Sequence, residues 1–271
     1  MKTLEIMYHP LDASPAEEVA GFTQASDFEF IEVHNPTDLR VSLSGVVISG
    51  AFDFSFSGSA TTALDPGQYA LIVRDRAAFE VRYGTGLPIA GEFGDNTLPD
   101  GGQKLANGGE QILITAVDGA VIRNFLYEDS SPWPLSADGP GNSLVLLRPT
   151  EFPDHGLAAS WRASVLSGGN PGGSDSSRFE GTAGADLDGN GIDDLLDYAI
   201  GHAPGAGDGL PVVTLNGGSF AISYRQNLAA DDIQLDAFWS DDLKSWQLLG
   251  DNFELISVTP DGRGHQTLIY Q

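Results

Sequence analysis

The sequence predicts a mainly β protein, an antiparallel β-sandwich followed by a smaller β module. Apolar runs are short, and no long stretch repeats with the 3.6-residue period of a helix. The 34 glycines and 15 prolines indicate many turns between short elements. Hydrophobic residues make up 41% of the 271 residues, which is enough to build the cores of two small domains. Regular short strands separated by turns are typical of a sandwich.

Seven segments within the first 150 residues are predicted to be strands, because each is short and is bounded by turn residues. They are Leu4–Tyr8, Phe28–His34, Val41–Ile48, Tyr69–Val73, Glu110–Val117, Ala120–Tyr127 and Ser143–Leu147. Asp118 and Gly119 form a two-residue turn of the kind that joins hairpin strands. One helix is predicted over Arg76–Tyr83, with Asp75 as its N-cap and Gly84 at its end.

The charge balance excludes several classes of partner. The net charge is −25, from 38 acidic and 13 basic residues, and such a surface repels the phosphates of nucleic acids. It also disfavours anionic membrane surfaces, and no apolar run is long enough to span a bilayer. We therefore expect no nucleic-acid partner and no membrane insertion. The absence of cysteine excludes disulfides, thiol nucleophiles and cysteine-based zinc sites.

Residues 186–197 carry the most specific ligand pattern in the chain. Oxygen-bearing side chains stand at positions 1, 3, 5, 9 and 12 of a twelve-residue loop, and Gly191 stands at position 6, where the loop must turn sharply. We predict one Ca²⁺ site here, closed by the last ligand, with Asp193 pointing outward. The predicted ligands are the side chains of Asp186, Asp188, Asn190, Asp194 and Asp197 and the backbone carbonyl of Ile192.

The alternative for this segment is a solvated acidic turn that caps the next helix. Five acidic side chains within twelve residues repel one another, which favours a bound cation. Leu195–Ile200 is predicted to be a short helix ended by Gly201 and Pro204, whereas residues 178–185 have no helical pattern. The segment therefore resembles one half of a dockerin repeat or an extracellular calcium loop, and not a full EF-hand.

Several motifs follow one another in order along the first 170 residues. They are residues 5–10 (EIMYHP), 27–36 (DFEFIEVHNP), 43–45 (LSG), 64–75 (LDPGQYALIVRD), 105–114 (LANGGEQILI), 133–134 (WP), 141–147 (GNSLVLL), 160–162 (SWR) and 169–172 (GNPG). Together they resemble a bacterial lamin tail domain over residues 3–170. The resemblance implies an immunoglobulin-like β-sandwich, usually a non-catalytic accessory module of secreted or surface proteins. An insert over residues 12–24 departs from the family pattern.

The remaining sequence suggests three further parts. We assign residues 1–166 to the sandwich, 167–184 to a flexible Gly/Ser-rich linker, 185–204 to the calcium loop and helix, and 209–271 to a small all-β module. The predicted strands of this last module are Ser219–Arg225, Ile233–Ser240, Gln247–Leu249, Phe253–Thr259 and Gln266–Tyr270. The order of loop, helix and tail resembles the C-terminal regions of secreted Verrucomicrobia-type proteins, and this resemblance assigns no activity.

Catalytic patterns are not evident, because the sequence has no Gly-x-Ser-x-Gly elbow, phosphate loop or His-Glu-x-x-His. His9 and His34 lie beside neighbouring predicted strands, where packing is favoured over a two-histidine metal site. Glu5 and Glu32 come together if their strands pair, and a structural use is favoured over acid–base catalysis. Among the four tryptophans, Trp133 stands between two prolines and is the best candidate for an exposed sugar platform, although packing in the core or at its rim is favoured.

Taken together, these observations predict a non-catalytic extracellular interaction or spacer module of a larger secreted or surface bacterial protein, stabilised by one calcium ion. The first residues lack the apolar stretch of a signal peptide, so we expect the chain to be part of a longer protein. The alternatives are a module that binds a glycan or a cell-surface protein and, less favoured, a hydrolase with an acidic site.

Overall fold

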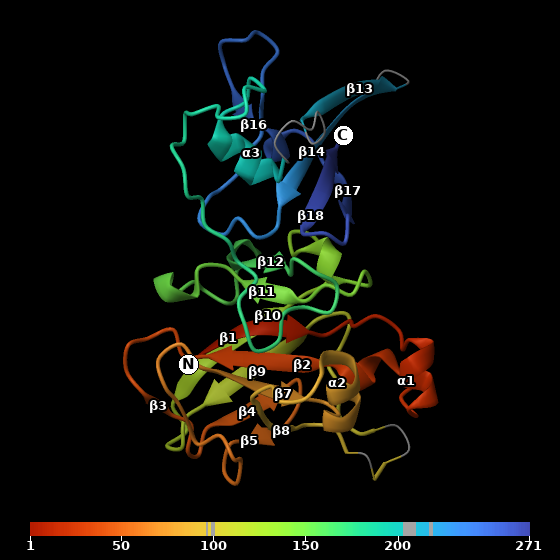
Figure 1. Cartoon of the computed structure of the whole chain (residues 1–271), viewed down its shortest axis with the longest axis vertical. Coiled ribbons are helices and arrows are strands. Elements are labelled where there is room, and N and C mark those ends of the chain that lie inside the picture. Colours follow the sequence, from red (N-terminus) through yellow and green to blue (C-terminus); the bar gives the residue numbers. More distant parts are fainter. Residues whose placement is uncertain (96, 99–100, 203–209, 217–218) are drawn as a thin grey trace. The chain divides into compact units, whose positions relative to one another are not determined.

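The computed structural model describes residues 1–95, 97–98, 101–202, 210–216 and 219–271. The chain divides into two compact units, Met1–Ser174 and Asp175–Gln271 (Figure 1). Strands outnumber helices in both units, and nearly all strand pairs are antiparallel. The prediction of a mainly β protein is therefore confirmed.

The larger sheet of the N-terminal unit has six strands in the order β12-β11-β1-β2-β7-β8. Their bounds are Lys2–Met7 (β1), Phe30–His34 (β2), Tyr69–Val73 (β7), Ile89–Glu92 (β8), Leu144–Leu146 (β11) and Trp161–Ala163 (β12). Only β7 and β8 pair in parallel. Because β1 pairs with both β2 and β11, the first strand of the chain occupies the middle of the sheet, and Glu5 lies opposite Glu32 there.

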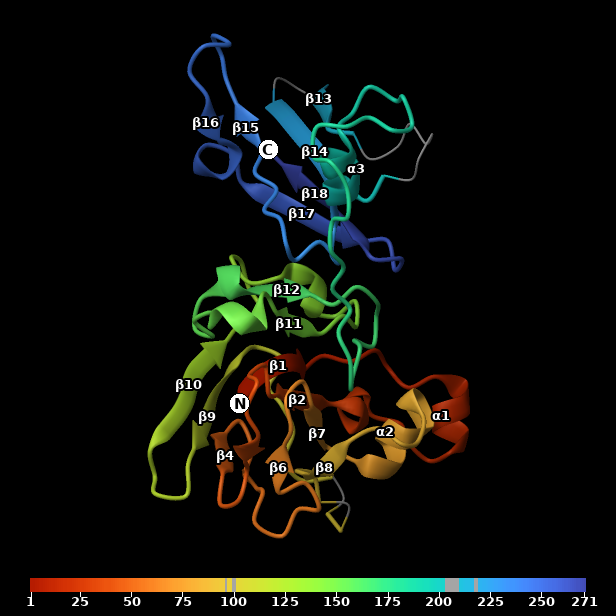
Figure 2. The same ribbon diagram turned by 60° about the vertical axis from the view of Figure 1, so that its left-hand side comes forward.

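A second sheet has four antiparallel strands in the order β10-β9-β4-β5. Their bounds are Val47–Gly50 (β4), Phe54–Ser55 (β5), Glu110–Thr115 (β9) and Val121–Tyr127 (β10), and a separate pair is formed by Val41–Ser42 (β3) and Ala63–Leu64 (β6). Figure 2 shows β9 and β10 as one long hairpin. A single hydrophobic core contains side chains from both sheets, for example Ile31 and Ile72 from the larger and Ile48 and Ile114 from the smaller. Removing these side chains from water is the main driving force for folding.

The other face of the six-stranded sheet is covered by helix α2, Arg76–Tyr83. The Asp75 side chain accepts a hydrogen bond from the Ala78 amide at 3.0 Å, as expected for an N-cap. A second hydrophobic cluster forms beneath the helix, from Met7, Phe30, Leu71, Val73, Phe79 and Ile89. Strands β1 and β2 are therefore buried on both faces, and polar side chains on them are buried as well.

The insert at residues 12–24 forms a short helix, α1, Pro15–Val19. Ser14 and Glu17 form a capping box, in which each side chain binds the backbone amide of the other residue. This helix was not predicted. Short 3₁₀ helices also occur at Ala25–Phe28, Leu135–Ala137, Pro149–Glu151, Ala158–Ser160 and Leu249–Asp251.

The C-terminal unit is built on a four-stranded antiparallel sheet in the order β13-β14-β18-β17. Its elements are Asp194–Ile200 (α3), Val212–Asn216 (β13), Ser219–Asn227 (β14), Phe238–Trp239 (β15), Gln247–Leu248 (β16), Leu255–Pro260 (β17) and His265–Tyr270 (β18). Helix α3 is held to β14 by Asn227, whose Nδ2 donates to the Tyr198 carbonyl at 2.9 Å. Few residues of this unit are fully buried.

Two predicted strands are broken or largely unpaired in the structure, whereas others differ only in where they begin and end. The segment predicted as Val41–Ile48 is broken into β3 and β4, because the Val46 amide binds the Leu43 carbonyl at 3.0 Å and Gly45 has a φ of 72°. Of the predicted strand Ile233–Ser240, only residues 238–239 (β15) pair with another described strand, which is β16. Pro204, the predicted stop of α3, and the predicted break at 205–209 lie outside the described residues.

The first residues of the predicted linker make hydrogen bonds to the N-terminal unit. The Gly168 amide donates to the Gly141 carbonyl at 2.7 Å, and the Asn170 amide donates to Oε1 of Glu5 at 2.9 Å. The Gly172 amide donates to Oε2 of Glu32. Residues 168–172 are thus tied to the sheet, because two buried carboxylates accept from their backbone.

Candidate functional site

The predicted calcium loop precedes α3 in the C-terminal unit. Gly189 and Gly191 have φ values of 73° and 89°, in the left-handed region that glycine adopts without strain. These two residues turn the chain, so that the side chains before and after them approach one another. The turn predicted at position 6 of the loop is therefore present at Gly191.

The first two predicted ligands bind the backbone of the turn. Asp186 accepts from the Asn190 amide at 3.0 Å through Oδ1 and from the Gly191 amide at 2.9 Å through Oδ2. Oδ1 of Asp188 also accepts from the Asn190 amide, at 3.0 Å. Both carboxylates thus point toward the inside of the loop.

The amide group of Asn190 lies at the centre of this arrangement. Its Nδ2 donates to Oδ2 of Asp188 at 3.1 Å and to Oδ2 of Asp197 at 2.9 Å. Its Oδ1 accepts from the Ile192 amide at 2.7 Å. The loop therefore brings residues at positions 3, 5 and 12 together, and a partial positive charge on Nδ2 stands between two carboxylates.

Asp197, the predicted closing ligand, is largely buried on α3. Nδ1 of His202 lies 3.1 Å from its Oδ1. The angle does not suit a hydrogen bond, and Oδ1 accepts none from any residue that the structure describes. A buried carboxylate oxygen without a donor is costly, because burial removes its hydration. His202 was not predicted as part of the site, although its position just after the helix that carries Asp197 could have suggested it.

Asp194 binds the start of the loop and makes no hydrogen bond to Asn190. Its Oδ1 accepts from the Leu187 amide at 3.0 Å, and its own amide donates to the Ala185 carbonyl at 2.7 Å. These two bonds close the loop onto the start of α3. Asp193 is the N-cap residue of α3, but its side chain makes no capping hydrogen bond. The capping alternative for the acidic cluster therefore receives no support from Asp193.

The donor set fits a hard cation in composition. Within the described ranges, no three His, Asp or Glu side chains are already arranged so that they could hold a metal ion together. The predicted site, however, also uses the Asn190 side chain and the Ile192 carbonyl, and calcium sites tolerate such mixed oxygen ligands. The buried Oδ1 of Asp197 is an oxygen that lacks a donor, and a cation would satisfy it.

The two-histidine metal site is not formed. His34 pairs with Lys2 at the start of β1, whereas His9 follows the end of that strand, so the two lie at opposite ends of the β1–β2 pair. Nδ1 of His9 is 2.6 Å from Oδ1 of Asp138, and the ring of His34 stacks on Tyr69 at 4.5 Å. Both histidines thus have local structural partners.

The predicted meeting of Glu5 and Glu32 is confirmed by the register of β1 and β2. Both side chains are buried, and Oε1 of Glu5 accepts from Oγ of Ser143 at 2.5 Å as well as from residue 170. Glu29 is another buried carboxyl, and burial raises its pKa to about 8. None of the three lines the hollows described on the surface.

Trp133 is buried, so the favoured packing role holds and the exposed platform does not. It is only 6% exposed, and its ring lies 6.3 Å from that of Trp161 in the main core. Trp246 in the C-terminal unit is instead 57% exposed. The flanking prolines were a misleading signal, because a loop can fold back over the core when its side chain is large and apolar.

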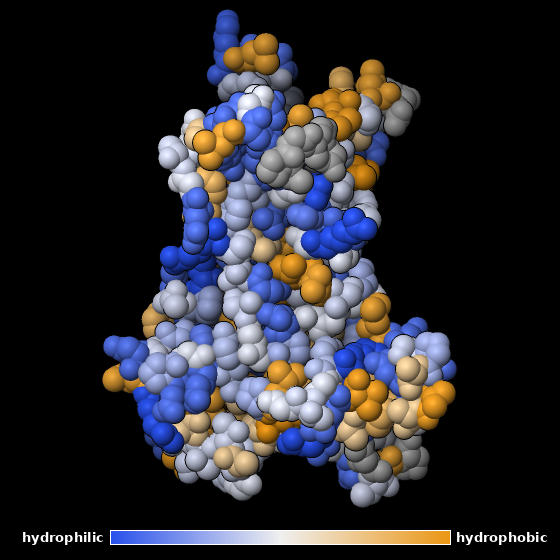
Figure 3. Space-filling model, in the orientation of Figure 1, coloured by the Kyte–Doolittle hydropathy of each residue, from blue (hydrophilic) through white to orange (hydrophobic). Residues whose placement is uncertain are grey.

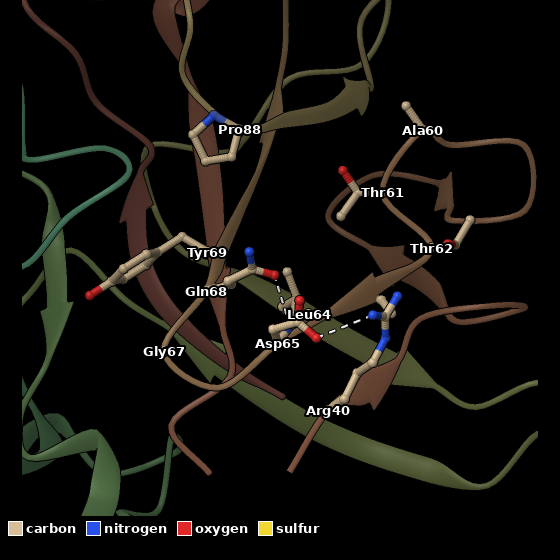
Figure 4. Close-up of a pocket in the computed structure, with 11 residues that line it drawn as sticks. Arg40, Ala60, Thr61, Thr62, Leu64, Asp65, Gly67, Gln68, Tyr69 and Pro88 are labelled. Atoms are coloured by element: carbon tan, nitrogen blue, oxygen red, sulfur yellow. Dashed lines mark hydrogen bonds and ion pairs between the residues drawn. The ribbon is translucent and has the colours of Figure 1, made fainter. Parts of the chain in front are cut away.

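One polar hollow lies beside the β3–β6 pair and has a volume of about 550 Å³. Figure 4 shows Asp65 joined by dashed lines to Arg40 and to Gln68. Nη1 of Arg40 is 3.3 Å from Oδ1 of Asp65, and the Asp65 amide donates to Oε1 of Gln68 at 2.8 Å. The hydroxyl of Thr61 and the ring of Pro88 add to its lining. Hydroxyl, amide and charged groups on an open surface can bind a polar ligand.

Apolar side chains gather on the β13–β14 hairpin of the C-terminal unit, seen in orange at the upper right of Figure 3. Val213, Leu215 and Phe220 are each more than half exposed. Leu215 pairs with Phe220, and Val213 pairs with Ile222, so their side chains share one face of the hairpin. Exposed apolar patches of this kind often mark interaction surfaces.

Comparison of the chain with protein families, characterised proteins and solved structures found no match. No helix in the described part of the chain is both long enough and apolar enough to cross a membrane.

Proposed function

We propose that this chain is a non-catalytic extracellular interaction or spacer module, and that its C-terminal unit is stabilised by one calcium ion. The observation that carries this proposal is the convergence of three carboxylates on Asn190. Asp186 accepts from its backbone amide, Asp197 from its side-chain amide and Asp188 from both. Four carbonyl- or carboxylate-bearing side chains at this spacing match the ligand pattern of a calcium loop.

The fold of the N-terminal unit supports the extracellular part of the proposal. We infer an immunoglobulin-like sandwich that resembles a bacterial lamin tail domain. Two largely antiparallel sheets that share one core support this inference, as does the position of β1 between β2 and β11. The strong negative charge also suits a medium in which cations are abundant.

Calcium would act on the folding of the C-terminal unit through α3. The side chains of Asp186, Asp188, Asn190, Asp194 and Asp197 and the Ile192 carbonyl would hold the ion. Because Asp194 and Asp197 belong to α3, the ion would fix the start of this helix, which β14 holds through Asn227. A ligand that binds only the folded state stabilises it, by about 2.7 kcal/mol at a hundred times its dissociation constant.

Calorimetric titration of chelator-stripped protein with calcium tests this proposal, together with thermal melting. We expect one site per chain and a rise in melting temperature. Both should be lost in the double variant Asp186→Ala, Asp188→Ala. Asp193→Ala is the matched control, since it removes an acidic side chain of the same loop that points outward and is not a predicted ligand. Absence of binding, or an equal loss in the control, would refute the calcium site.

A second candidate function is glycan binding, which the polar hollow beside β3 and β6 favours. Asp65, Gln68 and Thr61 present the donors and acceptors that sugar hydroxyls bind. A glycan array with and without calcium tests this function. Binding that is lost in Asp65→Ala and kept in Asp38→Ala, an exposed aspartate on the preceding loop, would support it.

A further inference from the structure

Lys2 carries a buried amine without a polar partner. The residue is 1% exposed, and its Nζ makes no hydrogen bond in the part of the chain that the structure describes. The Nζ lies over the ring of Phe152, whose centroid is 3.9 Å away. Lysine is rarely buried without a carboxylate, because removing the ammonium from water is costly.

A second cation lies close to this amine. Arg123 stands on β10, two positions before the buried Phe125, so the two side chains lie on the same face of that strand. Nη1 of Arg123 donates to the Ile122 carbonyl at 2.6 Å, while its Nε is buried and is not hydrogen-bonded to any described residue. Burial and the charge of Arg123 together lower the pKa of Lys2 to about 8. Lys2 and Arg123 thus bring like charges together from the two sheets of the N-terminal unit. The N-terminal ammonium of Met1 adds a third cation nearby, and burial together with the charges of Arg123 and Lys2 lowers its pKa.

No carboxylate compensates these two charges among the described residues. The chain has 38 acidic and 13 basic residues, so a basic side chain rarely lacks an acidic neighbour. Lys2 and Arg123 nevertheless take part in none of the ion pairs of the described ranges. Arginines that do include Arg40, Arg74, Arg76, Arg82, Arg148 and Arg225. The nearby rings of His34 and His155 are neutral at pH 7, because burial lowers the pKa of each to about 4.

The cover over Lys2 is a surface side chain. Phe152 is 68% exposed although its ring lies over Nζ. Its backbone has a φ of 59°, a left-handed conformation that is unfavourable for a bulky residue. An exposed ring can turn away without breaking the core, which would open a path to the amine.

We propose that Lys2 and Arg123 form a binding site for a small oxyanion of the phosphate type, which enters by displacing the ring of Phe152. A doubly charged oxyanion would neutralise both cations, and its several oxygens would accept from the ammonium and from the planar guanidinium at once. The site belongs to the N-terminal unit and is independent of the calcium loop.

Titration calorimetry with inorganic phosphate tests the proposal, in the presence of a chelator and at constant ionic strength set with chloride. We expect one site per chain. Lys2→Met and Arg123→Gln should each weaken the affinity about tenfold or more, as expected for the loss of one charge-assisted contact. Lys104→Met, which removes an exposed lysine of the same unit, is the matched control and should leave the affinity unchanged.

Phe152→Ala gives a result that a misfolded variant could not give. Without the ring, phosphate reaches Lys2 directly, so its affinity should increase. The double variant Asp186→Ala, Asp188→Ala should bind phosphate as the parent does, which separates this site from calcium binding. The proposal is overturned if the parent shows no saturable heat, if Lys104→Met loses as much affinity as Lys2→Met, or if Phe152→Ala binds phosphate less tightly.

Discussion

Arg82 binds both carboxylate oxygens of Glu17, through Nε at 2.8 Å and Nη2 at 2.9 Å. Both side chains are largely buried, and they join α1 to α2. The guanidinium carbon of Arg82 also lies 3.3 Å from the ring centroid of Phe28. The insert at residues 12–24 is therefore anchored to the helix that covers the six-stranded sheet, and its role in stability can be measured.

Glu17→Gln should lower stability at pH 7 by about 2 kcal/mol, because it removes the charge from a buried ion pair. Hydrogen bonds from Arg82 lower the pKa of Glu17 to about 2 from 4.5, although burial opposes the shift. The pair thus stabilises the protein fully above pH 4.5, and this contribution is lost as the pH falls toward 2. Urea unfolding across this range should show the loss in the parent and a smaller one in the variant. Exposed Glu18→Gln is the control, and equal effects of both variants would contradict the prediction.

Glu29 should have the opposite dependence on pH. Burial raises its pKa to about 8, against the effects of the Leu105 amide and of Arg74, which lower it. The protonated form favours folding, so its contribution is full below pH 4.5 and is lost as the pH rises through about 8.

Glu29→Gln should therefore be more stable than the parent at pH 8.5, on the order of 2 kcal/mol, and equal to it near pH 4. Chemical unfolding at the two pH values measures this difference. Glu110→Gln is the matched control, because Glu110 also accepts from a backbone amide, that of Ala106 at 3.0 Å, but is only half-buried. A variant less stable than the parent at pH 8.5 would contradict the prediction.

Asn190→Asp should separate the apo and calcium-bound states of the loop. The change removes the donor to Asp188 and Asp197 and adds a negative charge among carboxylates. In chelator we expect a loss of roughly 1–2 kcal/mol, visible as a lower melting temperature. In excess calcium the loss should vanish, because the new carboxylate is a stronger ligand than the amide. Equal destabilisation in both media would show that the loop binds no cation.

Trp133→Ala and Trp246→Ala should differ sharply in stability. Trp133 is packed in the core against Trp161, so its truncation leaves a cavity and should cost about 3–5 kcal/mol. Trp246 is mostly exposed, and its truncation should change stability by less than about 0.5 kcal/mol. Thermal unfolding of both variants measures the difference. Similar losses would mean that Trp246 is covered in solution.

The sequence predicted the elements whose signals are local. Strand β7, the helix Arg76–Tyr83 with its Asp75 cap, and the turn at Gly191 all lie where the pattern placed them, because caps and turns depend on residues a few positions apart. The ligand set of the calcium loop was likewise proposed from spacing alone.

Elements whose existence depends on distant partners were missed or misplaced. Strand β8 forms because β7 offers a parallel edge. Helix α1 was missed even though its capping box of Ser14 and Glu17 is a local signal, and its anchor to Arg82 lies more than sixty residues away. Trp133 was the best candidate for an exposed tryptophan because its local signals are those of a loop, yet it lies in the core. Burial is decided by the whole core, and no local pattern carries that information.

By itself, then, the sequence determined a β-rich, acidic, cysteine-free chain and the order of oxygen ligands in residues 186–197. Tertiary structure alone decided that Glu5 and Glu32 hold the start of the predicted linker, and that Lys2 and Arg123 approach each other without a carboxylate. The physical reason is that composition and spacing act along the chain. Burial, charge proximity and hydrogen-bond satisfaction depend instead on which distant strands become neighbours.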